Sequence, residues 1–429
     1  MLGRPLSRAG RALIRRRHVF YVAGYDPQGA KGYYGLFRRE WKRFLTLWPV
    51  KAELGELAID SDDIAHWDVK AAGPNWEVET RYEFMRQEAL IRSNLAQPIA
   101  RQIGRSVRWM LDYLASGALL RIFRVSWRFG LVLVYFQALL MLWVGIAVVG
   151  AGLGALGSMH LFHLPGPVAL FVGVAIGLAA FAALRPLAQR MFVIRINNHW
   201  PYLSEFARGN PSGFDRPIEA CAQRLVARAR AGEVDEIVVI GHSGGGVISP
   251  FVLTRALELD PDLGRHGPRI VLLTLGSIMP GVALHPAAVK MRAAIARLAV
   301  EPSIWWIDCQ ARKDVMNFWD FDPVAGVGVD IGSRRVNPLV WIVRYRDMIA
   351  LERYRRVARN FFRAHFQFIM ANDIRAPYDY FMLVCGPAAI ADRQHGMNLW
   401  ACFSENATYV AEASAPVAVR SRPSRMPVR

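Results

Sequence analysis

Cysteine is scarce in this chain of 429 residues, and its few thiols form no recognisable pattern. There is no C-x-x-C pair, and no histidine stands at metal-ligand spacing from a cysteine. These absences exclude a disulfide scaffold and a zinc-finger type of metal site. We therefore expect free buried thiols and no metal. The four cysteines are Cys221, Cys309, Cys385 and Cys402.

Charged residues are missing from one long stretch. No Asp, Glu, Lys or Arg occurs from Phe129 to Leu184. Because a helix needs about 20 apolar residues to cross the hydrocarbon core, this stretch is too long for one helix and suits two. Pro165-Gly-Pro167 is a turn signal between them. We expect a two-helix transmembrane hairpin over 129–184, and the alternative is a buried helical hairpin of a soluble core.

Arginines flank this stretch on both sides, whereas the expected connecting loop has no Lys or Arg. The positive-inside rule then places both termini, with the residues before and after the hairpin, on the cytoplasmic side of an inner membrane that the chain crosses more than once. The formal net charge of +18 also suits nucleic acid, but the chain has no zinc-finger spacing and no RNA-binding motif, so we expect no such partner. The flanking residues are Arg121, Arg124, Arg128, Arg185, Arg190 and Arg195.

A basic segment leads into the hairpin. Residues 101–128 are expected to form an amphipathic membrane-proximal helix that binds anionic lipid. Arg101, Arg105 and Arg108 fall on one face of that helix, and Trp109 adjoins them. The charged face of an ordinary globular helix explains the same pattern.

The most informative motif is a pentapeptide at residues 241–245, Gly-His-Ser-Gly-Gly. It follows the apolar run of residues 236–240 and precedes a stretch of small residues that is compatible with a helix. A G-x-S-x-G sequence between a strand and a helix forces Ser243 onto a tight turn that lifts its Oγ above the sheet. Pro250 is an irregularity, because it would kink or shorten the following helix.

An earlier expected strand ends at Ala23-Gly24-Tyr25, and further expected strands follow the motif. Together with the motif, these segments resemble the α/β-hydrolases of the lipase and esterase kind. The resemblance covers about two-thirds of the chain. It implies an α/β-hydrolase-like, mostly parallel sheet with helices on both faces, here interrupted by the hairpin. No narrower family is indicated.

The resemblance also implies a catalytic triad in the chain order serine, acid, histidine, with Ser243 as the nucleophile. The acid should follow the second strand after the motif, which favours Asp314, with Asp322 as the alternative and Asp308 less well placed within the strand. Histidines after that acid are His365, which we prefer, and His395.

For the oxyanion hole, the resemblance implies backbone N–H groups of Gly244 and of Gly24 or Tyr25. The chain departs from the family pattern in one respect. Only about 17 residues precede the first expected strand, so the usual first two strands are missing and the sheet should be shorter at that edge.

The expected organisation has five parts. Residues 1–100 would be the N-terminal part of the hydrolase domain, 101–128 the basic helix and 129–184 the hairpin. Residues 185–412 would be the main hydrolase domain, and 413–429 a disordered basic tail.

These features together predict a membrane-anchored serine hydrolase that cleaves lipid or acyl esters, a reaction that requires no metal and no organic cofactor. A thioesterase or an amidase would use the same residues. A protein of a different class, an inactive membrane scaffold with a hydrolase fold, is the further alternative. The sequence does not indicate an oligomeric state.

Overall fold

The computed structural model describes residues 13–209, 213–391 and 400–410. The chain divides into two compact units. The sheet unit comprises Met1–Ala89, Ser212–Ala283 and Lys290–Arg429, and the helical unit comprises Leu90–Pro211 and Leu284–Val289. The helical insertion therefore begins and ends outside the 101–184 expected for the basic helix and hairpin. The expected tail at 413–429 lies outside the described residues.

The sheet unit is α/β, with a mixed and mostly parallel sheet of nine strands. The strand order is β2-β4-β5-β1-β6-β7-β8-β9, and β3 pairs with β4. All neighbours from β5 to β9 are parallel, whereas β4 is antiparallel to β2, β3 and β5. The strands are β1 Arg16–Val22, β2 Lys51–Leu54, β3 Ala58–Ile59, β4 Ile64–Gly73, β5 Trp76–Met85, β6 Glu236–His242, β7 Arg269–Leu275, β8 Ile304–Gln310 and β9 Leu339–Ile342.

The edge of the sheet corrects one expectation. A shorter sheet was expected beside the first strand, but β5, β4 and β2 extend it there. The chain supplies these strands after β1, in the segment between β1 and the helical insertion. The expectation failed because strand order in a sheet does not follow strand order in the sequence.

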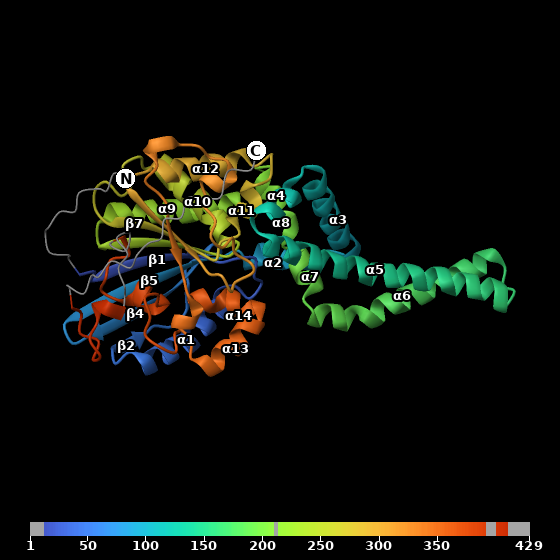
Figure 1. Ribbon diagram of the computed structural model, residues 1–429, viewed down its shortest axis with the longest axis horizontal. Helices are drawn as coiled ribbons and strands as arrows, with labels where there is room; N and C mark the ends of the chain where they lie inside the picture. Colours follow the sequence, from blue (N-terminus) through green and yellow to red (C-terminus); the bar gives the residue numbers. More distant parts are fainter. Residues whose placement is uncertain (1–12, 210–212, 392–399, 411–429) are drawn as a thin grey trace. The chain divides into compact units, whose positions relative to one another are not determined.

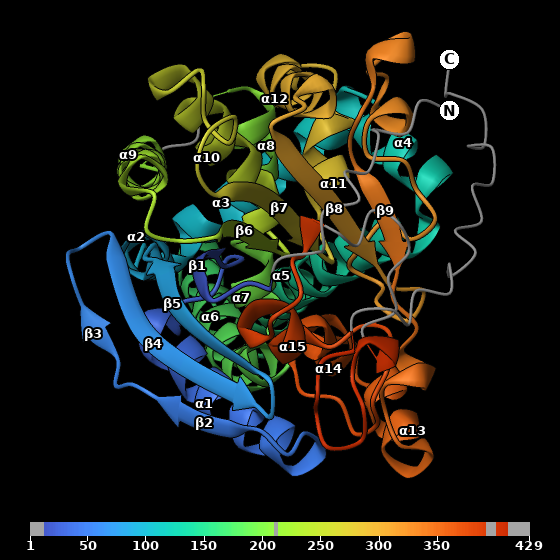
Figure 2. The ribbon, with the colours of Figure 1, turned by 90° about the vertical axis from the view of Figure 1, so that its left-hand side faces the viewer.

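Helices cover both faces of the sheet (Figures 1 and 2). Helices α9, α10 and α12 lie on one face, and α1, α13, α14 and α15 lie on the other. Because both faces are covered, every residue of β6 is buried, as are nearly all of β1, β7 and β8. The helices of this unit are α1 Gly29–Leu47, α9 Asp215–Ala231, α10 Gly245–Leu259, α11 Met279–Ala283, α12 Val289–Val300, α13 Leu351–Arg359, α14 Phe361–Phe366 and α15 Tyr380–Cys385.

Aromatic side chains pack α1 onto the sheet. They recur at helical spacing along α1 and are all buried, at Tyr33, Tyr34, Phe37, Trp41 and Phe44. The ring of Phe37 contacts the rings of Trp67 on β4 and Tyr82 on β5 edge-on, at centroid distances of 5.5 and 5.2 Å. This aromatic layer fixes α1, and with it the loop that precedes α1, against β4 and β5.

The amino ends of β1 and β6 are joined by a fully buried ion pair. Arg17 Nε donates to Glu236 Oε2 at 2.8 Å, and neither side chain is exposed. The other Arg17 nitrogens donate to the carbonyls of Gly386 and Ala388, at 2.7 and 2.9 Å. Glu236 Oε1 accepts from the backbone N–H of Ile390 at 2.8 Å. Burying two charges is tolerated here because both have partners.

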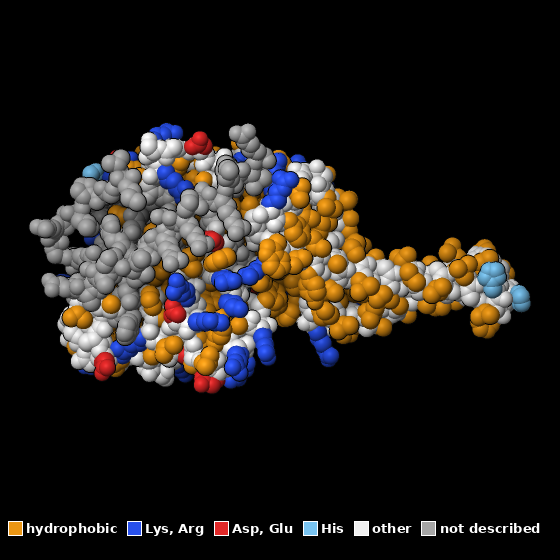
Figure 3. All heavy atoms as spheres, viewed as in Figure 1, with side chains coloured by type: hydrophobic (Ala, Val, Ile, Leu, Met, Phe, Trp, Pro, Cys, Tyr) orange, Lys and Arg blue, Asp and Glu red, His pale blue; other side chains and the backbone are white. Residues whose placement is uncertain are grey.

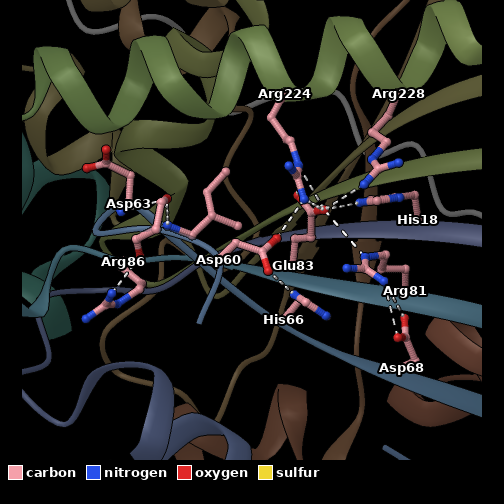
Figure 4. Close-up of polar contacts among 12 residues, drawn as sticks. His18, Asp60, Asp63, His66, Asp68, Arg81, Glu83, Arg86, Arg224 and Arg228 are labelled. Atoms are coloured by element: carbon pink, nitrogen blue, oxygen red, sulfur yellow. Dashed lines mark hydrogen bonds and ion pairs between the residues drawn. The ribbon is translucent and has the colours of Figure 1, made fainter. Parts of the chain in front are cut away.

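A second polar cluster lies between β5 and α9 (Figure 4). Glu83 of β5 is buried, and Arg224 of α9 donates to both of its carboxylate oxygens. His18 Nε2 of β1 lies 3.2 Å from Glu83 Oε1. Burial alone would raise the pKa of Glu83, but the contacts with His18 and Arg224 outweigh it and lower the pKa to about 2. The cluster therefore holds α9 on the sheet with a carboxylate that stays charged.

The helical unit contains two helices that are long and apolar enough to cross a membrane, α5 Trp127–Leu161 and α6 Gly166–Arg190. Their existence and the turn between them agree with the expected hairpin. The 101–128 segment, expected as one helix, forms two, because Gly117 adopts a φ of 70° between α3 and α4. The remaining bounds are α2 Glu88–Leu95, α3 Ile99–Ala115, α4 Ala118–Val125, α7 Val193–Asn197 and α8 Trp200–Ala207.

Candidate functional site

Ser243 follows β6 directly and precedes α10 by one residue. Its φ is 58°, in the left-handed region that side chains rarely adopt. Its backbone N–H donates to Leu275 O at 3.0 Å, and its carbonyl accepts from Gly246 N at 3.1 Å. The strained conformation is thus held by hydrogen bonds on both sides, as the strand-turn-helix interpretation of this motif predicts. Helix α10 continues through Pro250, so the proline does not shorten it.

The last glycine of the motif is needed for packing. A Cβ on Gly245 would lie 1.9 Å from the carbonyl oxygen of Val22, at the end of β1. No side chain could occupy that space, because the obstacle is backbone. The absence of a side chain at Gly245 therefore allows α10 to begin directly against β1, which brings Ser243 beside the loop that follows β1.

Asp314 and His365 form a buried pair. His365 Nδ1 lies 2.8 Å from Asp314 Oδ2, and the two residues come from the loop after β8 and from α14. Asp314 Oδ1 accepts from the backbone N–H of Met316 at 2.9 Å. These bonds fix the carboxylate and direct the opposite ring nitrogen of His365, Nε2, away from it. Among the described residues, His365 Nε2 is buried and has no hydrogen-bond partner.

The other carboxylates are engaged elsewhere. Asp322, the alternative acid, accepts from Arg335 Nη1 and Nη2 at 2.5 and 2.9 Å and caps the turn at Val324. Asp308 accepts from Thr274 and Gln310, and burial raises its pKa to about 6. The structure therefore brings Asp314, and neither of these two, to His365. The alternative histidine, His395, lies outside the described residues.

His242 and His365 are neighbours. Their rings stack with centroids 5.1 Å apart, and His242 Nε2 lies 3.3 Å from the carbonyl oxygen of His365. Burial, with the charge of His365 adding to it, lowers the pKa of His242 to about 3. His242 is therefore neutral at ordinary pH, and it would not repel a positive charge on His365.

The loop after β1 approaches the serine closely. A Cβ on Gly24 would lie 3.2 Å from both Ser243 Oγ and the backbone nitrogen of Gly244. The three residues expected to form an oxyanion hole, Gly24, Tyr25 and Gly244, thus lie on two segments that meet beside Ser243. The short aspartate turn that follows, in which Asp26 Oδ1 accepts from Gln28 N at 2.9 Å, leads the chain into α1.

Sequence reasoning missed one residue of this site, Gln87. Its Nε2 donates to the carbonyl oxygens of Ala23 and Gly24, at 2.7 and 3.1 Å, and the side chain is buried. In a trans peptide the N–H points opposite to the C=O, so Gln87 turns the N–H groups of Gly24 and Tyr25 away from itself. No local pattern marks Gln87, because its position opposite Gly24 comes from the parallel pairing of β1 and β5, in which Tyr21 faces Phe84.

One contact of a catalytic triad is not made. Ser243 Oγ forms no hydrogen bond with His365 Nε2 among the described residues. The two segments still meet, because His242, the neighbour of Ser243, stacks on the ring of His365 and lies 3.3 Å from its carbonyl oxygen. Catalytic hydrogen bonds are often long in a free enzyme and tighten when substrate binds. The arrangement therefore supplies a strained serine, an oriented imidazole and two backbone segments around them.

Within the described part of the chain, no group of three or more His, Cys, Asp or Glu side chains is placed to hold a metal ion. All four cysteines are buried free thiols, as expected. Comparison of the chain with protein-family models, with curated proteins and with solved structures gave no match.

Proposed function

We propose that this protein is a membrane-anchored serine hydrolase of the α/β-hydrolase kind, which cleaves carboxylic esters through Ser243, His365 and Asp314. The observation that carries the proposal is the left-handed conformation of Ser243 at a strand-to-helix turn, beside a buried Asp–His pair. A residue other than glycine is kept in such a conformation only where the surrounding structure enforces it, and such strain gathers at active sites. An ordinary strand-to-helix turn would need neither the strain nor the buried pair.

The position of Ser243 in the sheet also supports an active site there. From β1 the sheet is extended by β5 on one side and by β6 on the other. In open α/β sheets, ligands bind beyond the carboxyl ends of the strands, at the point where the strand order reverses. Gly24 and Ser243 follow the carboxyl ends of β1 and β6, so they flank this point.

In the proposed reaction His365 Nε2 takes the proton of Ser243 Oγ as that oxygen attacks the ester carbonyl. The N–H groups of Gly244 and of Gly24 or Tyr25 stabilise the negative oxygen of the tetrahedral intermediate. The intermediate collapses when His365 returns the proton to the departing alcohol, which leaves an acyl group on Ser243. Water, activated by His365, then releases the acid. Asp314 keeps the imidazole oriented and stabilises its charged form.

The membrane part of the proposal depends on the hairpin. Helices α5 and α6 would anchor the protein in an inner membrane, with the sheet unit and both termini in the cytoplasm because the arginines lie on that side. Anchoring would hold the site near esters of acyl lipids, which are the substrate class that we propose. No nucleic-acid partner, metal or organic cofactor is part of this function.

The test is labelling of the full-length protein in membranes with a fluorophosphonate probe, which reacts with an activated serine Oγ and loses fluoride. The wild-type protein should label, and Ser243→Ala should not. Ser249→Ala is the matched control, since Ser249 is a buried serine on α10 and its replacement should leave labelling intact. Labelling that persists in Ser243→Ala would overturn the assignment.

Two further variants identify the base. His365→Ala should abolish labelling, and His395→Ala should retain it. A wild-type protein that is folded but does not label supports the rival function, an inactive scaffold, which the missing bond between Ser243 and His365 favours. Comparing acyl esters with thioesters and amides of the same chain length would then decide among the three chemistries.

A further inference from the structure

The base of the hairpin carries an apolar surface that the helical unit leaves uncovered. Six large side chains on α3, α4 and the start of α5 are 48–60% exposed, at Leu111, Leu114, Leu120, Trp127, Leu131 and Tyr135. Figure 3 shows hydrophobic side chains running from the hairpin onto this end of the helical unit. We call these six residues the apolar platform. A patch of this kind on a protein surface marks an interaction site.

The platform is not the surface that the sequence pattern suggested. Trp109, expected beside lipid, is buried and lies 5.2 and 6.1 Å, between ring centroids, from Tyr113 and Trp200. Arg105, expected on the lipid-facing side, donates to Asn94 at 3.0 Å and to Glu205 at 2.8 Å. Both residues hold α3 within the helical unit, and the exposed face of α3 is the one that carries Leu111 and Leu114.

The lengths of the two hairpin helices locate the platform. Helix α5 has 35 residues and α6 has 25, about 52 and 37 Å at 1.5 Å per residue, whereas the hydrocarbon core is about 30 Å thick. They pack antiparallel: the rings of Trp143 and Phe181 stack at 4.2 Å, and a Cβ on Gly173 would lie 2.4 Å from the Ala151 carbonyl. In this register the first seven or so residues of α5 extend past the end of α6.

The charged residues at the end of α6 indicate how deep the start of α5 lies in the membrane. The first charged residues after the hairpin, Arg185 and Arg190, lie on the last turns of α6 and are exposed. The start of α5, with Trp127 and Tyr135 exposed, therefore lies at the depth where arginines leave the hydrocarbon. Tryptophan and tyrosine are enriched at that depth, because one part of each ring is apolar and another is polar.

Charge indicates which membrane surface the platform would contact. Arg101, Arg108 and Arg124 are exposed on the same helices, and Arg128 lies over the Trp127 ring at 5.6 Å. Exposed leucines beside arginines are the composition of helices that lie in the interface of an anionic leaflet. The alternative is that a second copy of the chain covers the platform, but such a contact would not require aromatic residues at the depth where the helices leave the membrane.

We propose that the apolar platform lies in the interface of an anionic lipid leaflet, with its leucines and Trp127 at the boundary between headgroups and acyl chains. This inference rests on the proposed membrane anchoring and not on catalysis. It makes α3 and α4 parts of the membrane-binding surface, although neither helix crosses the membrane.

The test uses the full-length protein in vesicles of phosphatidylethanolamine and phosphatidylglycerol. Single cysteines are introduced as Leu111→Cys and Leu120→Cys and labelled with an environment-sensitive fluorophore, since the four native thiols are buried. Leu153→Cys, in the second half of α5 where α6 packs against it, is the control within the bilayer, and Asp62→Cys, 91% exposed in the sheet unit, is the control in water. Nitroxide-labelled lipids then report the depth of each fluorophore.

We expect labels at 111 and 120 to be quenched about twofold by nitroxides near the headgroups and less by nitroxides at the bilayer centre, as for an interfacial helix. The label at 153 should be quenched most by the deep nitroxide, and that at 62 by neither. If the label at 153 is quenched while the labels at 111 and 120, like the label at 62, are not, the membrane-binding role of the platform is disproved and the membrane anchoring is supported. If the labels at 111 and 120 are shielded from water without quenching, protein covers the surface and the inference is wrong. If 153 is not quenched, both the anchoring and the platform fail, whereas probe labelling of Ser243 is unaffected.

Discussion

Strands β1 and β6 lie side by side along their length. Their amino ends and their carboxyl ends differ in whether the buried polar groups have partners. At the amino ends, Arg17 and Glu236 are buried with every charged group paired. At the carboxyl ends, Gly24 and Ser243 meet in a crowded turn with a strained φ, beside a histidine whose Nε2 has no partner among the described residues.

The difference between the two ends indicates that one serves stability and the other serves the proposed reaction. Buried polar groups with all partners present contribute to stability and specificity, whereas a buried group left without a partner needs another explanation. In the proposed enzyme the explanation is that His365 Nε2 is reserved for a proton from Ser243. If the two ends are independent, substitutions at the amino ends should change stability and substitutions at the carboxyl ends should change activity.

The largest effect should follow from Ser243→Ala. Removing the nucleophile should lower the rate of ester hydrolysis by about 10⁴–10⁶-fold, while the melting temperature stays within a few degrees of the wild-type value. Hydrolysis of a chromogenic acyl ester and thermal melting, measured on the same preparation, check both parts. A comparable rate loss in Ser249→Ala would show that α10, and not the hydroxyl, is responsible.

Arg17→Met should have the next largest effect, which should be on the free energy of unfolding and not on the rate of hydrolysis. It leaves the carboxylate of Glu236 buried without its charge partner, which costs about 3–5 kcal/mol in the free energy of unfolding. The double variant Arg17→Met/Glu236→Leu should recover most of that loss, because two apolar side chains then replace the pair. Thermal melting of the three proteins measures this, and a double variant no more stable than Arg17→Met would contradict it.

Acid should weaken the contact between β5 and α9. The folded-state pKa of Glu83 is about 2, below its ordinary value of 4.5, so its contribution is fully present above pH 4.5 and is lost as pH falls towards 2. The shift corresponds to roughly 3 kcal/mol. Melting temperatures between pH 5 and pH 2 should fall less steeply in Glu83→Gln than in wild type. Equal slopes would show that Glu83 does not carry the acid dependence.

The smallest effect should come from Gln87, which in the proposed enzyme would position the loop after β1 through its bonds to Ala23 and Gly24. Gln87→Met keeps the size but removes the donor to Ala23 and Gly24, so kcat should fall about 10–100-fold with KM nearly unchanged. Gln87→Leu, which also lacks the donor, should show the same loss. If Gln87→Met keeps the wild-type kcat, the side chain serves packing alone.

The sequence by itself determined the features that depend on neighbouring residues. The turn at Ser243 follows from glycines adjacent to it, the strands β6 to β8 from short apolar runs, and the hairpin from a long stretch without charge. Sterics and hydrophobicity act over a few residues in these cases, so they can be read along the chain.

Only the tertiary structure decided which distant residues meet. It paired His365 with Asp314 and engaged Asp322 with Arg335, placed Gln87 opposite Gly24, and filled the sheet edge with β4 and β2. It also buried Trp109 and exposed Leu111 on the same helix. Strand order and helix packing set these contacts, and both depend on burying apolar surface across the whole unit, which no local pattern encodes.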